Sequence, residues 1–507
     1  MHRILSASKD TYITNKIINN RFRATDANTG QAGTLDLFKL YAESTSGSDT
    51  SPTELSRLLL KFDISEVATM HNNNVINVGD SSFKAYLKLH DIYGGQTTPS
   101  NFKLICFPLS QSFDEGIGQD IVEFKDIDAT NWITASVSNG TVSEWNTTGA
   151  RSSGSLGDEN IDVIVNGTVQ GQGSPIALFG EQTFLAGDED LYINVTNFVS
   201  ASAKGLIDNH GFCIAYSGSY EKDQKTYFVK RFASRNTSNT AYHPKLIIKF
   251  NDSIIDDHEN FEFDYSGSLY LNNFSKGVLT NIVSGSAATE LSGADCMILK
   301  IQSGSFSKQF NVSQAVRGDS RLTGIYSASF AISSFESELY NHALASGSIT
   351  FNEIWSNENE TVTYLSSSLT INKNNRYALN FRENRLQVSM LNLRTRYKQD
   401  EIVKLRVYAQ NADRSVVFRK TPFELPSEIF PNMFYRVRDF LSGDVIIPFD
   451  TDAGDNSTKL SADSTGMYYD FYMSSLPRGR AYIFDFLIRQ NGFDTVIKDA
   501  ASKFIVE

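Results

Sequence analysis

Histidine is the side chain most often used for proton transfer near neutral pH, and it is a common metal ligand. The chain has seven histidines, and their spacing matches no metal-binding or catalytic motif. A Gly-x-Ser-x-Gly elbow, a phosphate-binding loop and a His-Glu-x-x-His motif are also missing from the sequence. We therefore expect a protein that is not an enzyme and that needs no metal or cofactor. The histidines are His2, His71, His90, His210, His243, His258 and His342.

Two acidic runs could bind calcium, because loops of β-sandwiches can present carboxylate oxygens to this ion. They are Asp114-Glu115 and the Asp-Glu-Asp run at 188–190. Their spacing fits no complete calcium loop. An acidic turn exposed to water explains both runs better, so we name no metal ligand.

Several aromatic residues in the first half of the chain could form a platform for a sugar ring. An exposed aromatic face combines an apolar surface with a polar handle, and nearby amides add hydrogen bonds. Burial of the same rings in a hydrophobic core is the competing explanation. The candidate sugar contacts are Trp132, Trp145, Tyr216 and Tyr220, with Tyr227 close by in the sequence.

Arg231 and Arg235 lie four positions apart on one face of a predicted strand. A guanidinium group makes two-pronged hydrogen bonds to carboxylates. We expect these arginines to anchor a loop in this way rather than to capture a ligand.

Charge restricts the choice of partners. The formal net charge is −12, and without a basic stripe we expect no nucleic-acid binding, because neutralising phosphates needs clustered Lys and Arg. No run approaches the roughly 20 apolar residues that span a bilayer, so no membrane contact is expected. The first residues lack the apolar core of a signal peptide, which predicts assembly in a cytoplasm. Cys106, Cys213 and Cys296 are widely spaced and read as small buried hydrophobic residues.

The last quarter of the chain is less acidic. Residues 394–438 contain ten Lys and Arg against five Asp and Glu. Such a region could dock on an acidic neighbour by charge complementarity, although ordinary surface charge accounts for the same count. The candidate docking residues are Arg394, Arg396, Lys404, Arg406, Arg436 and Arg438.

The elements that must position these residues are β-strands. In 56–64, Leu58, Leu60, Phe62 and Ile64 alternate with Arg57, Leu59, Lys61 and Asp63, which predicts a strand with one apolar face and one mostly polar face. The same alternation returns at 83–90, 101–108 and 244–250. A short helix is expected over 195–204. Residues 111–190, rich in Gly, Ser, Asn and Thr, are expected to form a surface loop.

The spacing of these strands predicts an all-β protein of three consecutive β-sandwich domains. The expected domains are 1–252, 258–384 and 385–507, of which the last two are smaller immunoglobulin-like sandwiches. The last of them should contain seven strands.

The first domain resembles the DNRLRE-type β-sandwich of surface proteins, and this resemblance implies a jelly-roll sandwich like a carbohydrate-binding module. The resemblance lies in Asp10-Thr-Tyr-Ile13, Leu59-Leu-Lys-Phe-Asp-Ile64, Ala85-Tyr-Leu-Lys-Leu89, Gly211-Phe-Cys-Ile214, Arg231-Phe-Ala-Ser-Arg235 and Pro244-Lys-Leu-Ile-Ile-Lys-Phe250. Where that family often has an acidic residue after its Ser-Arg pair, this chain has Asn236.

The third domain is similar to the C-terminal domain of virion structural proteins from contractile-tailed phages of marine bacteria, in which a similar sandwich follows a DNRLRE-like domain. The similar segments are 434–439, 443–449, 458–469, 475–482 and 504–506.

This resemblance implies a non-enzymatic component of a phage particle. Its location would be the virion, assembled in the host cytoplasm, around the neck or collar or along the tail. Its partners would be other copies of itself and other structural proteins of the neck, tail or baseplate. The alternative is a fibre or baseplate adhesin that binds a glycan of the host surface.

Overall fold

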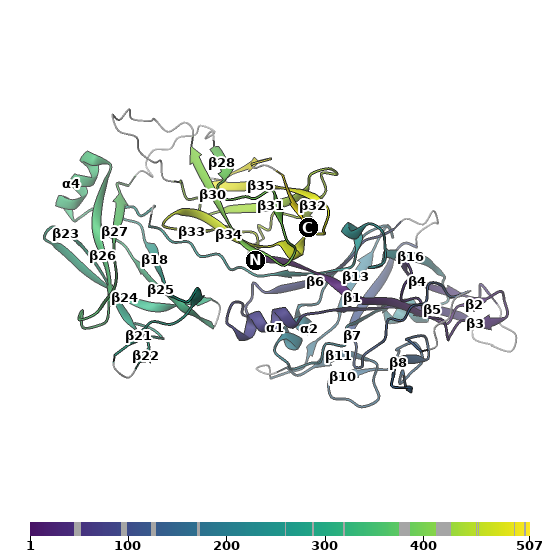
Figure 1. The fold of residues 1–507 in the computed structure, drawn as a ribbon. Coiled ribbons are helices and arrows are strands. Elements are labelled where there is room, and N and C mark those ends of the chain that lie inside the picture. The colour runs from purple at the N-terminus through teal and green to yellow at the C-terminus, as the bar shows by residue number, and fades with distance from the viewer. Residues whose placement is uncertain are drawn as a thin grey trace. The chain divides into compact units, whose positions relative to one another are not determined.

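The computed structural model describes residues 1–44, 52–92, 99–122, 128–169, 173–258, 260–285, 288–317, 320–374, 386–411, 427–452, 454, 456–490, 492–500 and 503–507 (Figure 1). The chain forms two compact units. The N-terminal unit consists of Arg3–Asn73 and Phe83–Lys249, and the C-terminal unit of Met1–His2, Asn74–Ser82 and Phe250–Glu507. Each unit is built from β-sheets, so the predicted all-β class is confirmed.

Helices are short in the described residues. They are α1 (Ser65–Asn72), α2 (Thr196–Ala203), α3 (Gly218–Lys222) and α4 (Ser337–Ser346), with 3-10 turns at η1 (Thr240–Tyr242) and η2 (Met473–Ser475). The predicted helix at 195–204 corresponds to α2 and is confirmed. No described helix combines the length and the hydrophobicity needed to cross a bilayer.

A ten-stranded sheet dominates the N-terminal unit. Eight strands follow the order β13-β7-β15-β5-β1-β17-β6-β14, while β4 pairs with β5, and β16 pairs with β4. Its strands are β1 (His2–Thr14), β4 (Thr34–Tyr41), β5 (Thr53–Phe62), β6 (Lys84–Leu89), β7 (Phe102–Pro108), β13 (Gly180–Phe184), β14 (Leu191–Asn194), β15 (Phe212–Tyr216), β16 (Tyr227–Ala233) and β17 (Lys245–Lys249). Small sheets are formed by β2 (Ile17–Ile18) with β3 (Phe22–Arg23), by β8 (Thr134–Ser138) with β9 (Thr141–Glu144), and by β10 (Ser153–Ser155), β11 (Val163–Gly167) and β12 (Ile176–Ala177).

Strand β5 lies inside this sheet and is buried on both faces, so the expectation of a half-buried strand is wrong. Leu59 on the second face is fully buried. Arg57 on the same face is 6% exposed, and its guanidinium binds the Glu221 carboxylate at 2.7 and 2.8 Å and the Ala150 carbonyl at 2.6 Å. The polar positions of β5 are therefore covered by another part of the unit.

Residues between 109 and 163 cover this face of β5 and form a hydrophobic core against it. The expectation that residues 111–190 form only a surface loop is wrong, because this segment contains strands β8 to β13, and β13 joins the main sheet beside β7. Its apolar side chains are few, but they gather in one place. The core consists of Ile13, Leu55, Leu59, Leu109, Phe113, Trp132, Ala135, Trp145, Ala150, Val163 and Cys213.

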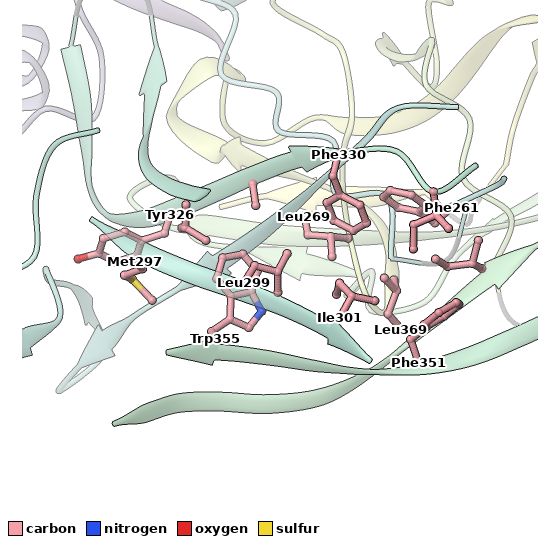
Figure 2. Close-up of a cluster of buried hydrophobic side chains, with 14 of the residues drawn as sticks. Phe261, Leu269, Met297, Leu299, Ile301, Tyr326, Phe330, Phe351, Trp355 and Leu369 are labelled. Carbon is pink, nitrogen blue, oxygen red and sulfur yellow. The ribbon is translucent and has the colours of Figure 1, made fainter. Parts of the chain in front are cut away.

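The middle of the chain forms a six-stranded antiparallel sheet in the order β18-β25-β24-β23-β26-β27. Its buried side chains form one layer with strands on both sides (Figure 2), in which the rings of Phe261 and Phe330 stack at 4.6 Å. The strands are β18 (Gly267–Asn272), β23 (Met297–Ser303), β24 (Phe306–Arg317), β25 (Ser320–Phe330), β26 (Ser348–Ser356) and β27 (Thr363–Asn372). Two small hairpins join β19 (Phe274–Ser275) to β20 (Val278–Leu279) and β21 (Val283–Ser284) to β22 (Thr289–Glu290).

The end of the chain forms two sheets, one in the order β28-β30-β34-β33 and one in the order β29-β37-β35-β31-β32 with β36 beside β35. All seven predicted strands are present, and the sequence pattern missed the short strands β29, β33 and β36. The strands are β28 (Leu386–Met390), β29 (Arg396–Tyr397), β30 (Ile402–Asn411), β31 (Met433–Asp439), β32 (Val445–Ile447), β33 (Ser461–Asp463), β34 (Gly466–Tyr472), β35 (Ala481–Gln490), β36 (Phe493–Ile497) and β37 (Phe504–Val506).

The two last sheets face each other as an immunoglobulin-like sandwich. Tyr435 of β31 stacks on Tyr469 of β34 at 4.5 Å between ring centroids. The Tyr482 hydroxyl at the start of β35 donates to the Pro477 carbonyl at 2.7 Å, which is the bond of a tyrosine corner. The predicted domain boundaries stay predictions, and the one at 384–385 lies outside the described residues.

Candidate functional site

The aromatic residues proposed for sugar binding do not form an exposed platform. Trp132 is 3% exposed, Trp145 is 4% exposed and Tyr216 is 2% exposed, so the expected platform is wrong for these three residues. The indole N–H of Trp145 donates to the Asn131 carbonyl at 3.0 Å, which satisfies its polar atom inside the core. Tyr220 is half-buried on α3, and its ring lies 5.8 Å from that of Tyr227.

Arg231 and Arg235 make the two-pronged bonds that their spacing predicts. Arg231 on β16 donates to both carboxylate oxygens of Asp36 on the neighbouring β4, at 2.7 and 2.8 Å. Arg235 donates to both oxygens of Glu115 at 2.6 and 2.7 Å. Because Glu115 lies at the start of the segment that covers β5, Arg235 fastens that segment, and the expected anchoring of a loop is confirmed for Arg235, whereas Arg231 joins two neighbouring strands.

Replacing Arg235 by lysine should destabilise the N-terminal unit by about 1–2 kcal/mol. An ammonium group keeps the charge but cannot make the two parallel bonds, and hydrogen bonds to charged groups contribute roughly 1.5–3 kcal/mol before the partial exposure of Arg235 is discounted. Hydrogen exchange followed peptide by peptide should show faster exchange at 111–122. Arg151→Lys is the matched control, since the Arg151 side chain donates to the Thr148 carbonyl and lies 5.8 Å from the centre of the Trp132 ring but pairs with no carboxylate among the described residues. Equal protection in Arg235→Lys and wild type would contradict the anchoring role.

Both acidic runs are occupied by protein groups. The Glu115 carboxylate is held by Arg235, as described. Around 188–190, the Lys230 ammonium contacts the Asp91 carboxylate and the carbonyls of Gly187 and Glu189, the last two at 2.8 Å. The Glu189 carboxylate accepts the backbone N–H groups of 185, 186 and 187. The Glu189 carboxylate and the carbonyls of Gly187 and Glu189 are therefore bound to backbone and lysine donors. Among the described residues no group of histidine, cysteine and acidic side chains could hold a metal ion.

His258 lies between two carboxylates of the C-terminal unit. Its ring nitrogens contact Asp256 and Glu353, the latter at 2.8 Å, and Glu353 is fully buried. Burial alone would lower the pKa of His258, but the hydrogen bonds to Asp256 and Glu353 raise it to about 10. The nearby Asp257 carboxyl has a raised pKa, first because it is buried. His258 is therefore a charged histidine at neutral pH that links the chain before β18 to strand β26.

Stability of the C-terminal unit should fall as the pH rises. The folded state binds the proton of His258 more tightly than the unfolded chain, so its contribution is complete below the ordinary pKa of 6.5 and is lost as the pH rises to about 10. We expect the urea midpoint measured by hydrogen exchange of β26 peptides to differ between wild type and His258→Gln at pH 6, and this difference to shrink by pH 10. A difference that is independent of pH would contradict this prediction.

The six basic residues proposed for docking fall into separate groups. Lys404 and Arg406 lie on β30, where the Lys404 ammonium is 3.9 Å from the centre of the Tyr468 ring and Arg406 binds both oxygens of Asp463 at 2.8 Å. Arg436 and Arg438 lie on β31, which belongs to a different sheet from β30. The structure therefore does not gather the six residues into one patch, and their docking role stays a prediction.

The remaining four are also paired with carboxylates. Arg436 and Arg438 on β31 share the fully buried Asp485, and they hold the pKa of this carboxyl below its ordinary value against the effect of burial. Arg394 pairs with Glu401, and Arg396 pairs with Glu507. Arg438 also pairs with Asp499 at 2.8 Å, so these four arginines have four carboxylate partners within the sandwich.

A hollow of about 330 Å³ opens on the N-terminal unit beside the end of β7. Apolar residues such as Leu156 and Ile207 form part of its wall. Its polar wall consists of amide, carboxylate and imidazole groups from Gln111, Asn146, Asp158, Asn160, Asp208 and His210. Burial lowers the pKa of His210, so its ring is neutral at physiological pH and can both donate and accept a hydrogen bond.

The sequence analysis missed Lys230 and Glu353, although each has a signal in its strand. Lys230 occupies the same face as the buried Phe232. Glu353 occupies the same face as the buried Phe351 and Trp355. A charged residue at an apolar position of a period-2 pattern indicates a buried charge with a dedicated partner.

The fold and these pairings define a class: an all-β protein that ends in an immunoglobulin-like sandwich and holds many of its arginines, and the buried Lys230, against carboxylates. No protein-family model matches the chain, and no curated protein matches it.

Solved structures give only a distant likeness. The chain is similar to fibronectin(III)-like modules of Clostridium thermocellum CbhA, with 9% identity over 51% of this chain and 92% of that chain and a TM-score of 0.14. It is similar to the titin fragment A168169, with 8% identity over 50% and 95% and a TM-score of 0.16. It is also similar to Escherichia coli alpha-2-macroglobulin activated by porcine elastase, with 7% identity over 100% and 43% and a TM-score of 0.16. At these scores the fold class rests on the strands and sheets described above.

Proposed function

We propose that this protein is a non-enzymatic structural component of a tailed-phage virion, present in several copies around the neck or tail. It would join neighbouring subunits through complementary surfaces and exposed sheet edges. Its location would be the assembled particle, and its partners would be further copies and other structural proteins of the neck, tail or baseplate.

The order of the sheets is the observation that carries this proposal. A large antiparallel sheet in 3–249 comes first, and an immunoglobulin-like sandwich in 386–506 comes last. This is the order in which the sequence resembles virion proteins at both ends. The bonds from Arg235 to Glu115 support the proposal too, because they fix the segment that covers β5 in one position.

Labelling intact particles with an antibody against residues 391–507 tests the proposal directly. The expected result is label at the neck or along the tail, in a constant number of copies per particle as counted by quantitative mass spectrometry of purified particles. Protein present in infected-cell lysate but absent from purified particles would overturn it. Label only at fibres or at the distal baseplate would favour the adhesin.

A glycan-binding adhesin is the second candidate function, and the polar hollow beside β7 is the observation that favours it. Amides, carboxylates and a neutral imidazole over an apolar wall are the groups that recognise sugar hydroxyls. This places the candidate site in a different position from the buried tryptophans.

Calorimetry with host polysaccharide separates the two functions. An adhesin should give saturable heat that Asn160→Ala and Asp208→Ala both abolish, while Glu159→Ala, an exposed neighbour outside the hollow, should bind as wild type does. A structural component should give no saturable heat with any of these proteins.

A further inference from the structure

Strand β27 forms one edge of the six-stranded sheet, and no described residue pairs with this edge between Ser366 and Thr370. On one side β27 pairs with β26 from Ser348 opposite Asn372 to Trp355 opposite Leu365. At the opposite edge of the sheet, the preceding segment contacts β18 at Ser268, because the Asp257 N–H donates to the Ser268 carbonyl at 3.0 Å and the Ser268 N–H donates to the Asp257 carboxylate at 2.8 Å.

Hydrogen bonds at the end of β27 show which of its backbone groups point outward. The Asn372 N–H donates to the Phe261 carbonyl at 2.7 Å, and the Asn372 carbonyl accepts from the Phe263 N–H at 3.2 Å. The next residue, Lys373, donates in the opposite direction, to the Gly347 carbonyl before β26 at 3.0 Å. Backbone groups alternate in direction along a strand, so those of Ser366, Ser368 and Thr370 point away from β26. No described residue binds these three N–H groups and three carbonyls.

The open part of this edge, the window from Ser366 to Thr370, has none of the features that keep sheet edges apart. Natural edges carry lysine, proline or bulges, or they are very short. Residues 363–372 contain no charged residue, no proline and no glycine, and Leu365, Ser366, Ser367 and Ser368 are all exposed. The only register irregularity in the pairing with β26 lies upstream of the window, between Trp355 and Ser356. The window is therefore ready to accept another strand.

We propose that the partner strand is β27 of a second copy of this chain, added antiparallel about a two-fold axis at Ser368. Ser366 of each copy then lies opposite Thr370 of the other, and the three outward residues of both copies form six backbone hydrogen bonds. The window suits itself as a partner because it presents a hydroxyl side chain at all three outward positions. Opposed hydroxyl residues pair well across strands, and no like charges are brought together.

The length of the window fixes the register. At Asn372 the segment 261–263 already occupies the outer side of β27, so an added strand cannot pair beyond Thr370. Leu365 of one copy would lie opposite Ile371 of the other, which joins two aliphatic residues at the margin of the contact. This inference deepens the proposed function, since it names the surface through which copies join.

Proline at Ser368 provides the first test. Proline removes the outward N–H, which β26 does not use, and adds a ring on the open side, whereas Ser368→Ala keeps the N–H. Light scattering of the purified full chain should show a dimer for wild type and Ser368→Ala and a monomer for Ser368→Pro, with unchanged circular dichroism for all three. A monomeric wild type at every concentration, or a dimer that Ser368→Pro leaves intact, would overturn the proposal.

Disulfide trapping tests the register without depending on proline. In a Cys296→Ser background, Ser368→Cys should cross-link two copies on mild oxidation, because residues opposite each other in a hydrogen-bonded pair have Cα atoms about 5.5 Å apart, which a disulfide spans. Ser366→Cys is the matched control. Its two sulfurs would be four residues apart along the ladder, about 13 Å, and should not cross-link. Equal cross-linking at both positions would overturn the two-fold register.

These tests and the particle labelling fail independently. Label on particles with a monomeric, non-cross-linking protein would reject the β27 contact and leave the structural role in place. A dimer that never appears on particles would keep the contact and reject the structural role.

Discussion

Replacing Asp91 by alanine should destabilise the N-terminal unit by about 3–5 kcal/mol, because it leaves the Lys230 ammonium buried without its counter-charge. The Lys230 side chain is fully buried, and the rings of Phe184 and Phe232 lie 5.3 and 5.1 Å from the ammonium. Burial lowers the pKa of Lys230, and its contacts with Asp91 oppose this shift. Hydrogen exchange of β5 and β16 peptides in urea would measure the loss, unit by unit.

Two further variants distinguish the loss of the Asp91–Lys230 ion pair from the cost of burying an unpaired charge. Lys230→Met fills nearly the same volume without a charge, so it should cost less than Asp91→Ala. The double variant should be more stable than Asp91→Ala alone, because the stranded charge is gone. If Asp91→Ala and the double variant were equally unstable, the buried charge would not be the cause.

Replacing Trp355 by alanine should destabilise the C-terminal unit by about 3–5 kcal/mol, the usual cost of deleting a large buried aromatic side chain. Trp355 is fully buried between the strands of the six-stranded sheet (Figure 2), and its indole N–H donates to Glu353. Alanine therefore creates a cavity and also removes a hydrogen-bond donor from a buried carboxylate that His258 shares. Urea denaturation followed by circular dichroism would measure the loss.

Val362→Ala is the control for this prediction, since Val362 precedes β27 in the same domain and is 47% exposed. Such a surface change should alter the free energy of unfolding by no more than about 0.5 kcal/mol. A Trp355→Ala protein as stable as Val362→Ala would mean that the core around Trp355 closes without cost.

Period-2 alternation located most strands of the chain, because each strand buries one face against another sheet. It worked best over 386–506, where both sheets of the sandwich alternate regularly. It failed at β5, whose odd-numbered residues looked solvent-facing. Arg57 is polar in the sequence but buried in the fold, because Glu221 and the carbonyl of Ala150 satisfy its guanidinium.

The composition of the segment that covers β5 led to a wrong prediction. Its Gly, Ser and Asn suggested exposure, yet Trp132 and Trp145 are enough to build a core when they meet Leu59 and Leu109. The bonds from Arg231 and Arg235 to carboxylates could be predicted from residue type, whereas the identities of Asp36 and Glu115 could not. The open edge of β27 was not predictable either, because the side of a strand that stays unpaired depends on the order of strands in the sheet.

The C-terminal unit is assembled from segments that are synthesised at different times. Residues 74–82 belong to this unit, although they are translated within the N-terminal unit. The Ser82 hydroxyl accepts from the Asn251 N–H, and the Val75 carbonyl accepts from Arg317. At roughly 5–20 residues per second, these partners leave the ribosome about ten seconds or more after residue 82. These two contacts of the segment can therefore form only after the N-terminal unit has been synthesised in full.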